Sequence, residues 1–335
     1  MKQIRLALIG AGATGRAHAA GALAAGGFKI AAIVDPIAER LTAAATQFKA
    51  ETSAATADEV LAKADIDAVC LCVPTQHHAA LATAALKAGK HVLCECPPGP
   101  TTKEANAIAK AAEKNQKVLL YSAVRRFGAA EQSARQAIEK GYVGPAYHAR
   151  VSATRTRGVP HGTGWYHDPA QSGGGAIIDL GLPMLDLALD LMGSPKPARV
   201  FAIGHKPLLK LPVEEMGSAL ITLDNGGSIE LTCAWAINQP TNQIGTTCRI
   251  SGENGALDVY TPAGPVLYRG FEGKEPKAVA LKQPKVAGHA AMFRHFRDCI
   301  AGTAKPLVGV AAGIAWMELA TAVYKSISTG KAVEV

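Results

Sequence analysis

A glycine-rich turn near the start of the chain has the spacing that phosphate binding requires. It reads Gly10-Ala11-Gly12-Ala13-Thr14-Gly15 and lies between an apolar run, 4–9, and an alanine-rich stretch, 15–25, that we expect to be helical. Gly10 permits a tight turn, Gly12 lets the backbone approach a pyrophosphate, and Gly15 lets the helix pack on the strand. The start of the helix adds N–H groups and a positive dipole end. We therefore expect a dinucleotide here, with an ordinary glycine turn as the alternative.

A carboxylate stands where a dinucleotide-binding unit selects its cofactor. Asp35 ends the next apolar run, 29–34, at the usual distance of about 20 residues from the glycine turn. There it can accept hydrogen bonds from an adenosine ribose 2′-hydroxyl and would repel a 2′-phosphate, so the sequence predicts NAD rather than NADP. Arg40, on the following helical stretch, can reach a phosphate or stack on adenine, or is a solvated helix residue.

Two further loops follow buried apolar runs and carry polar residues. Pro74-Thr75-Gln76-His77-His78 follows the run 68–73, and Glu95-Cys96-Pro97 follows the run 91–94. Ligands bind at the carboxyl ends of parallel strands, so we expect Pro74, Thr75, His78, Glu95 and Cys96 to line the cofactor. For the histidines, polar residues at the start of a helix are the alternative interpretation.

Four of the seven cysteines fall in two closely spaced pairs, Cys70 with Cys72 and Cys94 with Cys96. Alternate residues on neighbouring strands point the same way and can converge on a metal, but the spacing is C-x-C rather than C-x-x-C. Buried strands also favour cysteine as a small hydrophobic residue, and we predict no metal. An odd number of cysteines without a secretory signal is typical of a reducing compartment, so we expect a cytoplasmic protein.

The elements that position these residues alternate along the first part of the chain. After the first strand, helix and strand come helical and extended stretches at 40–49, 68–73, 78–88, 91–94, 102–115 and 118–122. Alternating strands and helices predict a parallel sheet covered by helices on both faces. The sequence thus indicates an α/β protein whose residues 1–123 form a doubly wound Rossmann domain.

From residue 124 the pattern changes to longer alternating segments separated by glycine, proline and asparagine. These segments, which we expect to be antiparallel strands, are 146–156, 198–205, 216–223, 226–235 and 246–251. Two helices, 289–301 and 310–328, close the chain. Residues 124–335 are therefore expected to form a second, α+β domain.

The composition excludes several classes of protein. With 335 residues, 48% hydrophobic and 19% charged, the chain is long and apolar enough for two folded domains. The net charge of +8 is spread among acidic residues, which argues against a nucleic-acid partner but suits an anionic cofactor or substrate. No apolar run reaches the roughly 18 residues of a membrane span, so we expect no membrane association.

The chain as a whole resembles the Gfo/Idh/MocA family of nicotinamide-dependent oxidoreductases. The motifs that carry the resemblance are the glycine turn, Asp35-Pro36, Pro74-Thr75 with His78, His91-Val92-Leu93-Cys94-Glu95, Arg126-Phe127, and Ser172-Gly173-Gly174-Gly175-Ala176-Ile177-Ile178-Asp179-Leu180-Gly181 with Asp186. The resemblance implies that the second domain is built on a large open, mostly antiparallel sheet and serves substrate binding and oligomerisation, in a homodimer or homotetramer. It also implies hydride transfer between NAD and a hydroxyl or keto group of a sugar, polyol or cyclic diol.

Two positions depart from the family pattern. The family's Glu-Lys-Pro is Glu95-Cys96-Pro97 here, and its Asp-x-Gly-x-His is Asp179-Leu180-Gly181-Leu182-Pro183. The lysine and the histidine that the family uses near the reacting hydroxyl are therefore replaced by Cys96 and Pro183. Asp179 is left to bind a substrate hydroxyl or act as the base, unless backbone N–H groups satisfy it at a helix start. Cys96 acts as a thiolate or is simply a small replacement.

A glycine-rich segment before Asp179 gathers ionisable and aromatic groups between residues 155 and 168. His167 or Tyr166 can replace the missing acid/base, because the segment leads directly to Asp179. The alternative is that Trp165 and Tyr166 pack the loop and His167 is solvated. We expect Trp165, Arg126 and Arg155 to bind a polyhydroxylated or anionic substrate, with a subunit interface as the alternative for the arginines.

The sequence is also compatible with two other functions. A redox-neutral lyase or hydrolase would use NAD only transiently, and a catalytically impaired protein would bind the dinucleotide without turnover. Both alternatives rest on the replacement of the family's lysine and histidine by Cys96 and Pro183.

Overall fold

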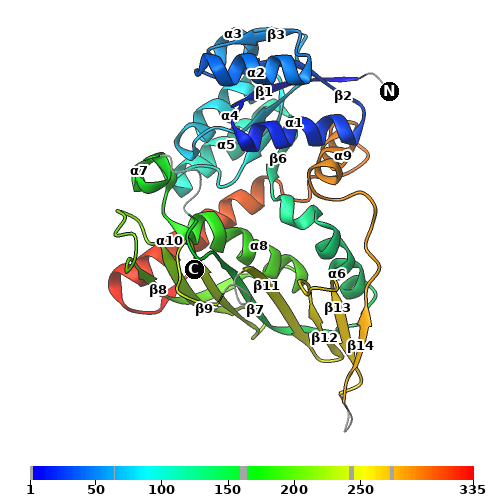
Figure 1. Cartoon of the computed structure of the whole chain (residues 1–335), viewed down its shortest axis with the longest axis vertical. Coiled ribbons are helices and arrows are strands. Elements are labelled where there is room, and N and C mark those ends of the chain that lie inside the picture. The colour runs from blue at the N-terminus through cyan, green and yellow to red at the C-terminus, as the bar shows by residue number, and fades with distance from the viewer. Residues whose placement is uncertain (1–2, 64, 159–163, 241–244, 272–274) are drawn as a thin grey trace. The chain divides into compact units, whose positions relative to one another are not determined.

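The computed structural model describes residues 3–63, 65–158, 164–240, 245–271 and 275–335. The chain forms two compact units, labelled by element in Figure 1. Unit 1 comprises Met1–Phe127 and Val286–Met317, and unit 2 comprises Gly128–Lys285 and Glu318–Val335. The predicted α/β class, with a parallel sheet first and a mostly antiparallel sheet second, is confirmed.

Unit 1 is built on a parallel sheet whose described strands run in the order β3-β2-β1-β4-β5-β6. This is the strand order of a dinucleotide-binding fold, with the order reversing between β1 and β4. The strands are β1 (Ile4–Ile9), β2 (Phe28–Val34), β3 (Thr52–Ala54), β4 (Ala68–Leu71), β5 (His91–Glu95) and β6 (Leu119–Ser122). Residues of β1 and β4 are almost wholly buried, as the apolar runs predict.

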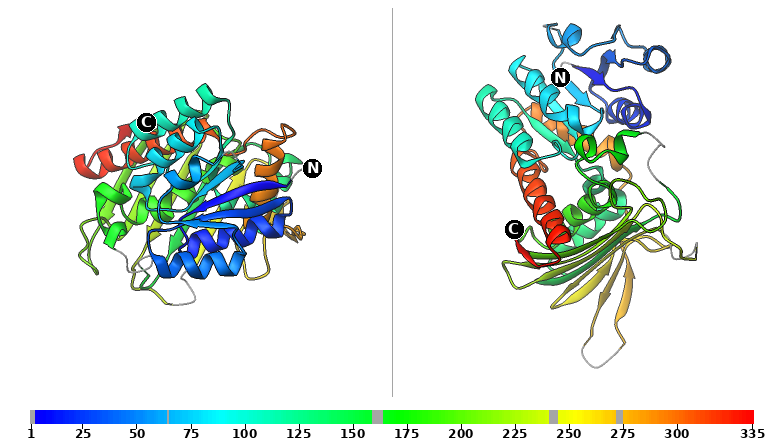
Figure 2. Two further views of the ribbon diagram at one scale, coloured as in Figure 1. Left: turned by 90° about the horizontal axis from the view of Figure 1, so that it is seen from above. Right: turned by 90° about the vertical axis from the view of Figure 1, so that its left-hand side faces the viewer.

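Helices cover both faces of this sheet, as Figure 2 shows in its left view. They are α1 (Ala13–Ala25), α2 (Ala38–Phe48), α3 (Asp58–Leu61), α4 (His78–Lys87), α5 (Thr102–Asn115) and α9 (Gly288–Ile300), with 3₁₀ turns η1 (Thr75–His77) and η2 (Val124–Phe127). Helix α5 begins at a capping box in which Thr101 and Glu104 bond reciprocally. The helix α9 packs against α1 through His289 and Phe293, whose rings contact His18.

Unit 2 is built on a sheet whose described strands run in the order β14-β13-β12-β11-β7-β10-β9-β8-β15. They are β7 (Ala146–Thr154), β8 (Pro197–His205), β9 (Met216–Leu223), β10 (Ser228–Ala234), β11 (Gly245–Gly252), β12 (Gly255–Asp258), β13 (Val266–Arg269), β14 (Lys277–Ala280) and β15 (Val333–Glu334). All pairs are antiparallel except β7 with β10.

The helices of unit 2 gather on one face of this sheet (Figure 2, right). They are α6 (Ala129–Glu139), α7 (Pro169–Ser172), α8 (Leu182–Leu191) and the last part of α10 (Val310–Thr329), with the 3₁₀ turn η4 (Gly164–His167) and the π-helix η5 (Ile177–Gly181). The core under α8 is apolar, with Leu185, Leu187 and Trp235 fully buried. This face carries the residues that the sequence singles out around Asp179.

The division into units differs from the expected domains in two respects. The first stretch of unit 1 extends to Phe127 rather than to residue 123. The helix predicted at 289–301 was assigned to the second domain, but α9 and the first part of α10 belong to unit 1. The physical reason is that the apolar face of α9, with Phe293 and Phe296, packs on Phe28 beside α1.

Candidate functional site

The glycine turn follows β1. Two of its glycines, Gly10 and Gly15, have no room for a side chain, whereas Gly12 has open space beside it. Gly10 has φ +97°, and a Cβ there would lie 2.2 Å from the Cys72 carbonyl oxygen. A Cβ on Gly15 would lie 1.9 Å from the Gly10 carbonyl oxygen. At Gly12, by contrast, a Cβ would meet no described atom within 4 Å. The turn is therefore tight where strand and helix meet, and open at the glycine that a pyrophosphate would approach.

The N-terminus of α1 has the properties of an anion-binding helix end. Gly12 is the N-cap, no side chain caps the helix, and its first turn contains no acidic residue. Ala13 and Thr14, which begin the helix, are exposed. The first N–H groups of a helix lack partners within it and carry partial positive charge, so they can bind a phosphate.

Asp35 lies against the same turn. It is 5% exposed, its Oδ2 accepts a hydrogen bond of 2.8 Å from the Ala11 N–H, and its Oδ1 accepts one of 2.9 Å from the Ile37 N–H. Each carboxylate oxygen has a second lone pair that can accept from a hydroxyl. Arg40 is exposed on α2. The fold thus brings the glycine turn and Asp35 together, as a cofactor site requires.

The loop after β4 places Pro74 before η1, with Thr75 buried in the turn. His78, expected at the cofactor, lies inside the protein instead. Its Nδ1 is 2.7 Å from the Pro97 carbonyl oxygen, its Nε2 is 2.8 Å from the Val73 carbonyl oxygen, and burial lowers its pKa. The ring joins the loops after β4 and β5, so it holds their backbones rather than presenting a nitrogen to a ligand.

Glu95 is held by a histidine that the sequence analysis did not identify. The Oε1 of Glu95 is 2.5 Å from Nε2 of His18 in α1, and the Ser122 hydroxyl is 3.4 Å from the same nitrogen. Burial alone would raise the pKa of Glu95, but these partners lower it. Cys96, which follows, is half-buried and precedes a cis peptide bond to Pro97. Arg126 lies in η2 and is 8% exposed.

In unit 2, Asp179 lies on the short π-helix η5, directly before α8. Leu182 donates its N–H to the Ile177 carbonyl oxygen, five residues back. The next residue, Pro183, has no N–H and stands in the first turn of α8, where that loss costs least. Short π-helical turns such as η5 are frequent at functional sites. Pro183 is therefore part of the turn that presents Asp179.

Two side chains from other elements meet the Asp179 carboxylate. The indole Nε1–H of Trp235, directly after β10, donates to Oδ2 over 2.8 Å, and Nη1 of Arg155, directly after β7, lies 3.7 Å from Oδ2. Trp235 is fully buried, whereas the Asp179 side chain is 22% and the Arg155 side chain 44% exposed. The structure thus unites Asp179 and Arg155 as expected for a substrate site and adds Trp235, which sequence reasoning missed.

The loop that follows Arg155 is described at 156–158 and again from residue 164 onwards, and the part at 159–163 lies outside the described residues. Trp165 and Tyr166 stack in η4 with ring centroids 3.7 Å apart, and Tyr166 packs on the core of unit 2. The Nε2 of His167 is buried and has no hydrogen-bond partner among the described residues. His167 is thus partly buried rather than solvated, and it offers a nitrogen for proton transfer.

The glycine run before Asp179 is fixed by Glu214 and Tyr324. One oxygen of Glu214 accepts from the N–H groups of Gly175 and Ile177, each over 3.0 Å, and from the Tyr324 hydroxyl over 2.8 Å. A Cβ on Gly175 would lie 2.0 Å from the Glu214 carbonyl oxygen. The start of η5 is therefore tied to buried groups, which positions the Asp179 carboxylate.

The family assignment follows from comparison with known proteins. Residues 4–123 match the family described as "Oxidoreductase family, NAD-binding Rossmann fold", and residues 132–258 match the "GFO/IDH/MocA C-terminal domain". The chain is 30% identical to the UDP-N-acetylglucosamine 3-dehydrogenase of Acidithiobacillus ferrooxidans, with 90% of each chain covered. It is 27% identical to the D-glucoside 3-dehydrogenase of Escherichia coli K12, covering 99% of this chain and 97% of the relative. The chain belongs to the Gfo/Idh/MocA family.

A solved structure agrees in fold over the whole length. The levoglucosan dehydrogenase in complex with NADH and L-sorbose superimposes with a TM-score of 0.90, at 20% identity and with 100% of this chain and 99% of that chain covered. The prediction of a nicotinamide-dependent oxidoreductase acting on a hydroxyl or keto group is thus confirmed at the level of class.

Proposed function

We propose that this protein oxidises a secondary ring hydroxyl of a glucoside-like sugar with NAD⁺, or reduces the corresponding keto sugar with NADH. The observation that carries the proposal is the Asp179 carboxylate, which Trp235 holds and Arg155 faces. Two relatives are named as 3-dehydrogenases of glucose-type sugars, which favours the hydroxyl on carbon 3 as the reacting group.

In this proposal, some residues bind the cofactor and the substrate, and Asp179 takes part in proton transfer. Oxidation of a C–OH group to C=O removes a hydride from carbon and a proton from oxygen, and NAD⁺ supplies the acceptor for the hydride. The glycine turn, the start of α1 and Asp35 have the open backbone, the uncapped N–H groups and the carboxylate that the dinucleotide needs. Asp179 receives the hydroxyl proton, and Arg155 donates hydrogen bonds to the substrate.

His167 supports this assignment as a second proton carrier. Its buried Nε2 has no hydrogen-bond partner among the described residues, and a buried polar atom without a partner calls for an explanation, of which a catalytic role is one. In the proposal, His167 is the second side chain that can accept the hydroxyl proton. Cys96 and Tyr166 stay predicted contributors, as do Thr75, Arg126 and Trp165.

The proposal is tested by incubating the protein with NAD⁺ and methyl glucosides, while following nicotinamide absorbance and product mass together. We expect a product lighter by two hydrogens in step with NADH, and loss of activity on a 3-deoxy glucoside. Turnover of the 3-deoxy sugar at an equal rate would exclude carbon 3 as the site of oxidation.

Asp35 should make NAD the preferred cofactor. In Asp35→Asn the charge that repels a 2′-phosphate is removed, while an oxygen is retained to accept from the Ala11 N–H. A charged hydrogen bond is worth about 2 kcal/mol, so the ratio of kcat/KM for NAD to that for NADP should fall roughly thirtyfold. Glu39→Gln, an exposed carboxylate on α2, is the matched control. An unchanged ratio in Asp35→Asn would contradict the assignment.

We also propose that two copies pair through the sheet face of unit 2 that exposes apolar side chains. Phe201 on β8 and Leu220 on β9 are directly paired and 41% and 51% exposed, and Ile203 beside them is 44% exposed. Three large apolar groups on adjacent strands favour burial against another chain. Leu220→Asp should lower the mass measured by light scattering to that of a monomer, whereas Ala107→Asp, an exposed position on α5 away from this face, should not. A monomeric unsubstituted chain would refute this pairing.

The cellular location stays a proposal. Among the described residues no cysteine forms a disulfide, which suits a reducing cytoplasm. Among the described residues, no helix is both long and apolar enough to span a membrane.

A further inference from the structure

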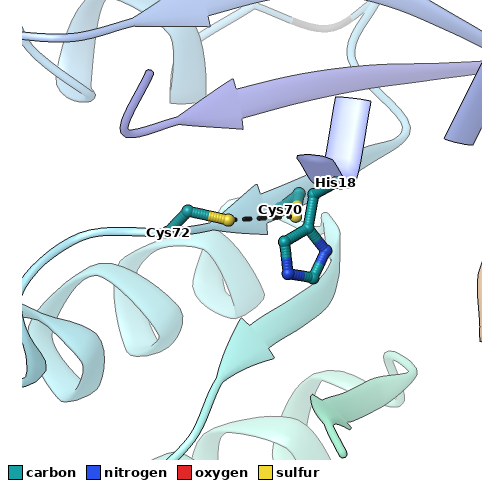
Figure 3. Close-up of side chains that lie close together, drawn as sticks. All are labelled: His18, Cys70 and Cys72. Atoms are coloured by element: carbon teal, nitrogen blue, oxygen red, sulfur yellow. Dashed lines mark hydrogen bonds between the residues drawn. The ribbon is translucent and has the colours of Figure 1, made fainter. Parts of the chain in front are cut away.

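Three potential metal ligands converge in unit 1 beneath the glycine turn. They are His18 of α1, Cys70 of β4 and Cys72, which follows β4 (Figure 3). One ligand atom from each lies within 4.8 Å of the other two, and the two sulfurs are 3.6 Å apart. Cys70 and Cys72 are two residues apart on an extended chain, so their side chains project to the same side. The sequence pattern suggested Cys94 and Cys96 as partners, but the structure brings His18 to this pair instead.

One ring nitrogen of His18 contacts a carboxylate, and the other has no hydrogen-bond partner among the described residues. Its Nε2 lies 2.5 Å from Oε1 of Glu95. Its Nδ1 is buried and has no hydrogen-bond partner among the described residues, and the side chain is fully inaccessible. Leaving a buried polar atom without a partner is costly, so such an atom needs an explanation.

A carboxylate that binds one nitrogen of a histidine is the usual outer partner of a metal-bound imidazole. Histidines that ligate a metal almost always donate their other ring N–H to a carboxylate, a carbonyl or water, which orients the ring. Glu95 provides this contact to His18, and Ser122 adds a hydroxyl 3.4 Å from the same nitrogen. The ring is thus supported in the way that a ligand histidine is.

The sulfur spacing suits a tetrahedral thiolate site. With zinc–sulfur distances of about 2.3 Å, two sulfurs of a tetrahedral site lie about 3.8 Å apart. The observed separation of 3.6 Å needs little adjustment. Two thiolates and one imidazole leave the fourth position to water, and soft sulfur ligands select zinc or a similar thiophilic cation over magnesium or calcium.

We propose that a ring nitrogen of His18, together with the thiolates of Cys70 and Cys72, binds one Zn²⁺ or a similar thiophilic cation. Binding replaces the thiol protons and any proton on that nitrogen, which are released to solvent. The inference is independent of the sugar substrate and of the catalytic role of Asp179.

The position of this site connects it to the dinucleotide turn. The Cys72 carbonyl oxygen would be 2.2 Å from a Cβ on Gly10, and the Cys72 Cβ would be 3.5 Å from a Cβ on Gly15. Cys72 is therefore packed against both closed glycines of the turn. A cation that fixes the Cys72 side chain also fixes the backbone that shapes the turn, so its occupancy should alter NADH affinity.

The test is a titration of the chelator-treated full chain with Co²⁺, which reports thiolate ligands by its charge-transfer absorption and tetrahedral geometry by its visible bands. We expect one equivalent to bind and Zn²⁺ to displace it. Cys72→Ser and His18→Asn should each raise the Kd for Co²⁺ more than tenfold, whereas Cys248→Ser, a buried thiol on β11, should not. Circular dichroism of each variant establishes that it is folded.

A second measurement uses the unsubstituted chain and does not depend on variants. Zn²⁺ should protect Cys72, the more exposed of the two thiols, from alkylation, as read by peptide mass, and should change the Kd for NADH. The proposal is overturned if no Co²⁺ thiolate absorption appears, or if it persists unchanged in the folded Cys72→Ser variant. Protection of Cys94 or Cys96 in place of Cys72 would also overturn it.

Discussion

Asp179→Asn should lower kcat by about 10² to 10⁴-fold, the usual contribution of a general base, while the Kd for NADH stays unchanged. The amide keeps the shape of the side chain and can still accept from the Trp235 indole, but it cannot take a proton from the substrate. Steady-state kinetics give kcat, and quenching of protein fluorescence by NADH gives the Kd.

Two further variants test whether the loss of kcat is specific to the Asp179 carboxylate. Asp258→Asn removes a carboxylate that pairs with Arg249 elsewhere in unit 2 and should leave kcat within about twofold. Trp235→Phe removes the indole N–H that holds Asp179, so it should lower kcat by an intermediate factor of roughly ten. A rate in Asp179→Asn equal to that of the unsubstituted chain would remove Asp179 from the proton transfer.

Gly15→Ala and Gly12→Ala should separate the folding role of the glycine turn from its binding role. A methyl group at Gly15 would lie 1.9 Å from the Gly10 carbonyl oxygen, so α1 must move away from β1. We expect a loss of about 3 kcal/mol in the free energy of unfolding, together with weak NADH binding. A methyl group at Gly12 meets no described atom, so stability should be retained while the Kd for NADH rises at least tenfold.

The two glycine variants are measured by denaturant unfolding and by NADH titration of the same samples. Gly26→Ala is not a suitable control because its φ is +74°, which disfavours any side chain. Ala24→Ser, an exposed position in the last turn of α1, is suitable and should leave both quantities nearly unchanged. Normal NADH affinity in Gly12→Ala would show that the dinucleotide does not approach this turn.

Features of the fold that depend on short stretches of sequence could be predicted. The alternation of apolar runs and alanine-rich helices predicted the parallel sheet, because each buried strand and each helix has its own short pattern. The turn geometry could also be predicted, because its two cramped positions, Gly10 and Gly15, lie within six residues and glycine alone has no Cβ. Short strands such as β3, β14 and β15 were missed because two to four residues with mostly exposed side chains give no periodic signal.

The sequence was least informative where a site depends on distant partners. His18 meets Glu95 across 77 positions, and Trp235 meets Asp179 across 56 positions, so neither pairing has a local signature. A histidine in an alanine-rich helix and a tryptophan at the end of a strand were the available signals. His78 shows the converse, because its position suggested cofactor contact while its ring nitrogens face the backbone carbonyls of Val73 and Pro97.

Direct hydride exchange between a sugar carbon and the nicotinamide can be followed with a methyl glucoside deuterated at carbon 3. The protein is incubated with this sugar and NAD⁺, and both the nicotinamide and the sugar product are analysed by mass. We expect one deuterium in NADH for each keto sugar formed. A product without net NADH, or NADH without the label, would contradict oxidation at that carbon and point to redox-neutral chemistry or another reacting hydroxyl.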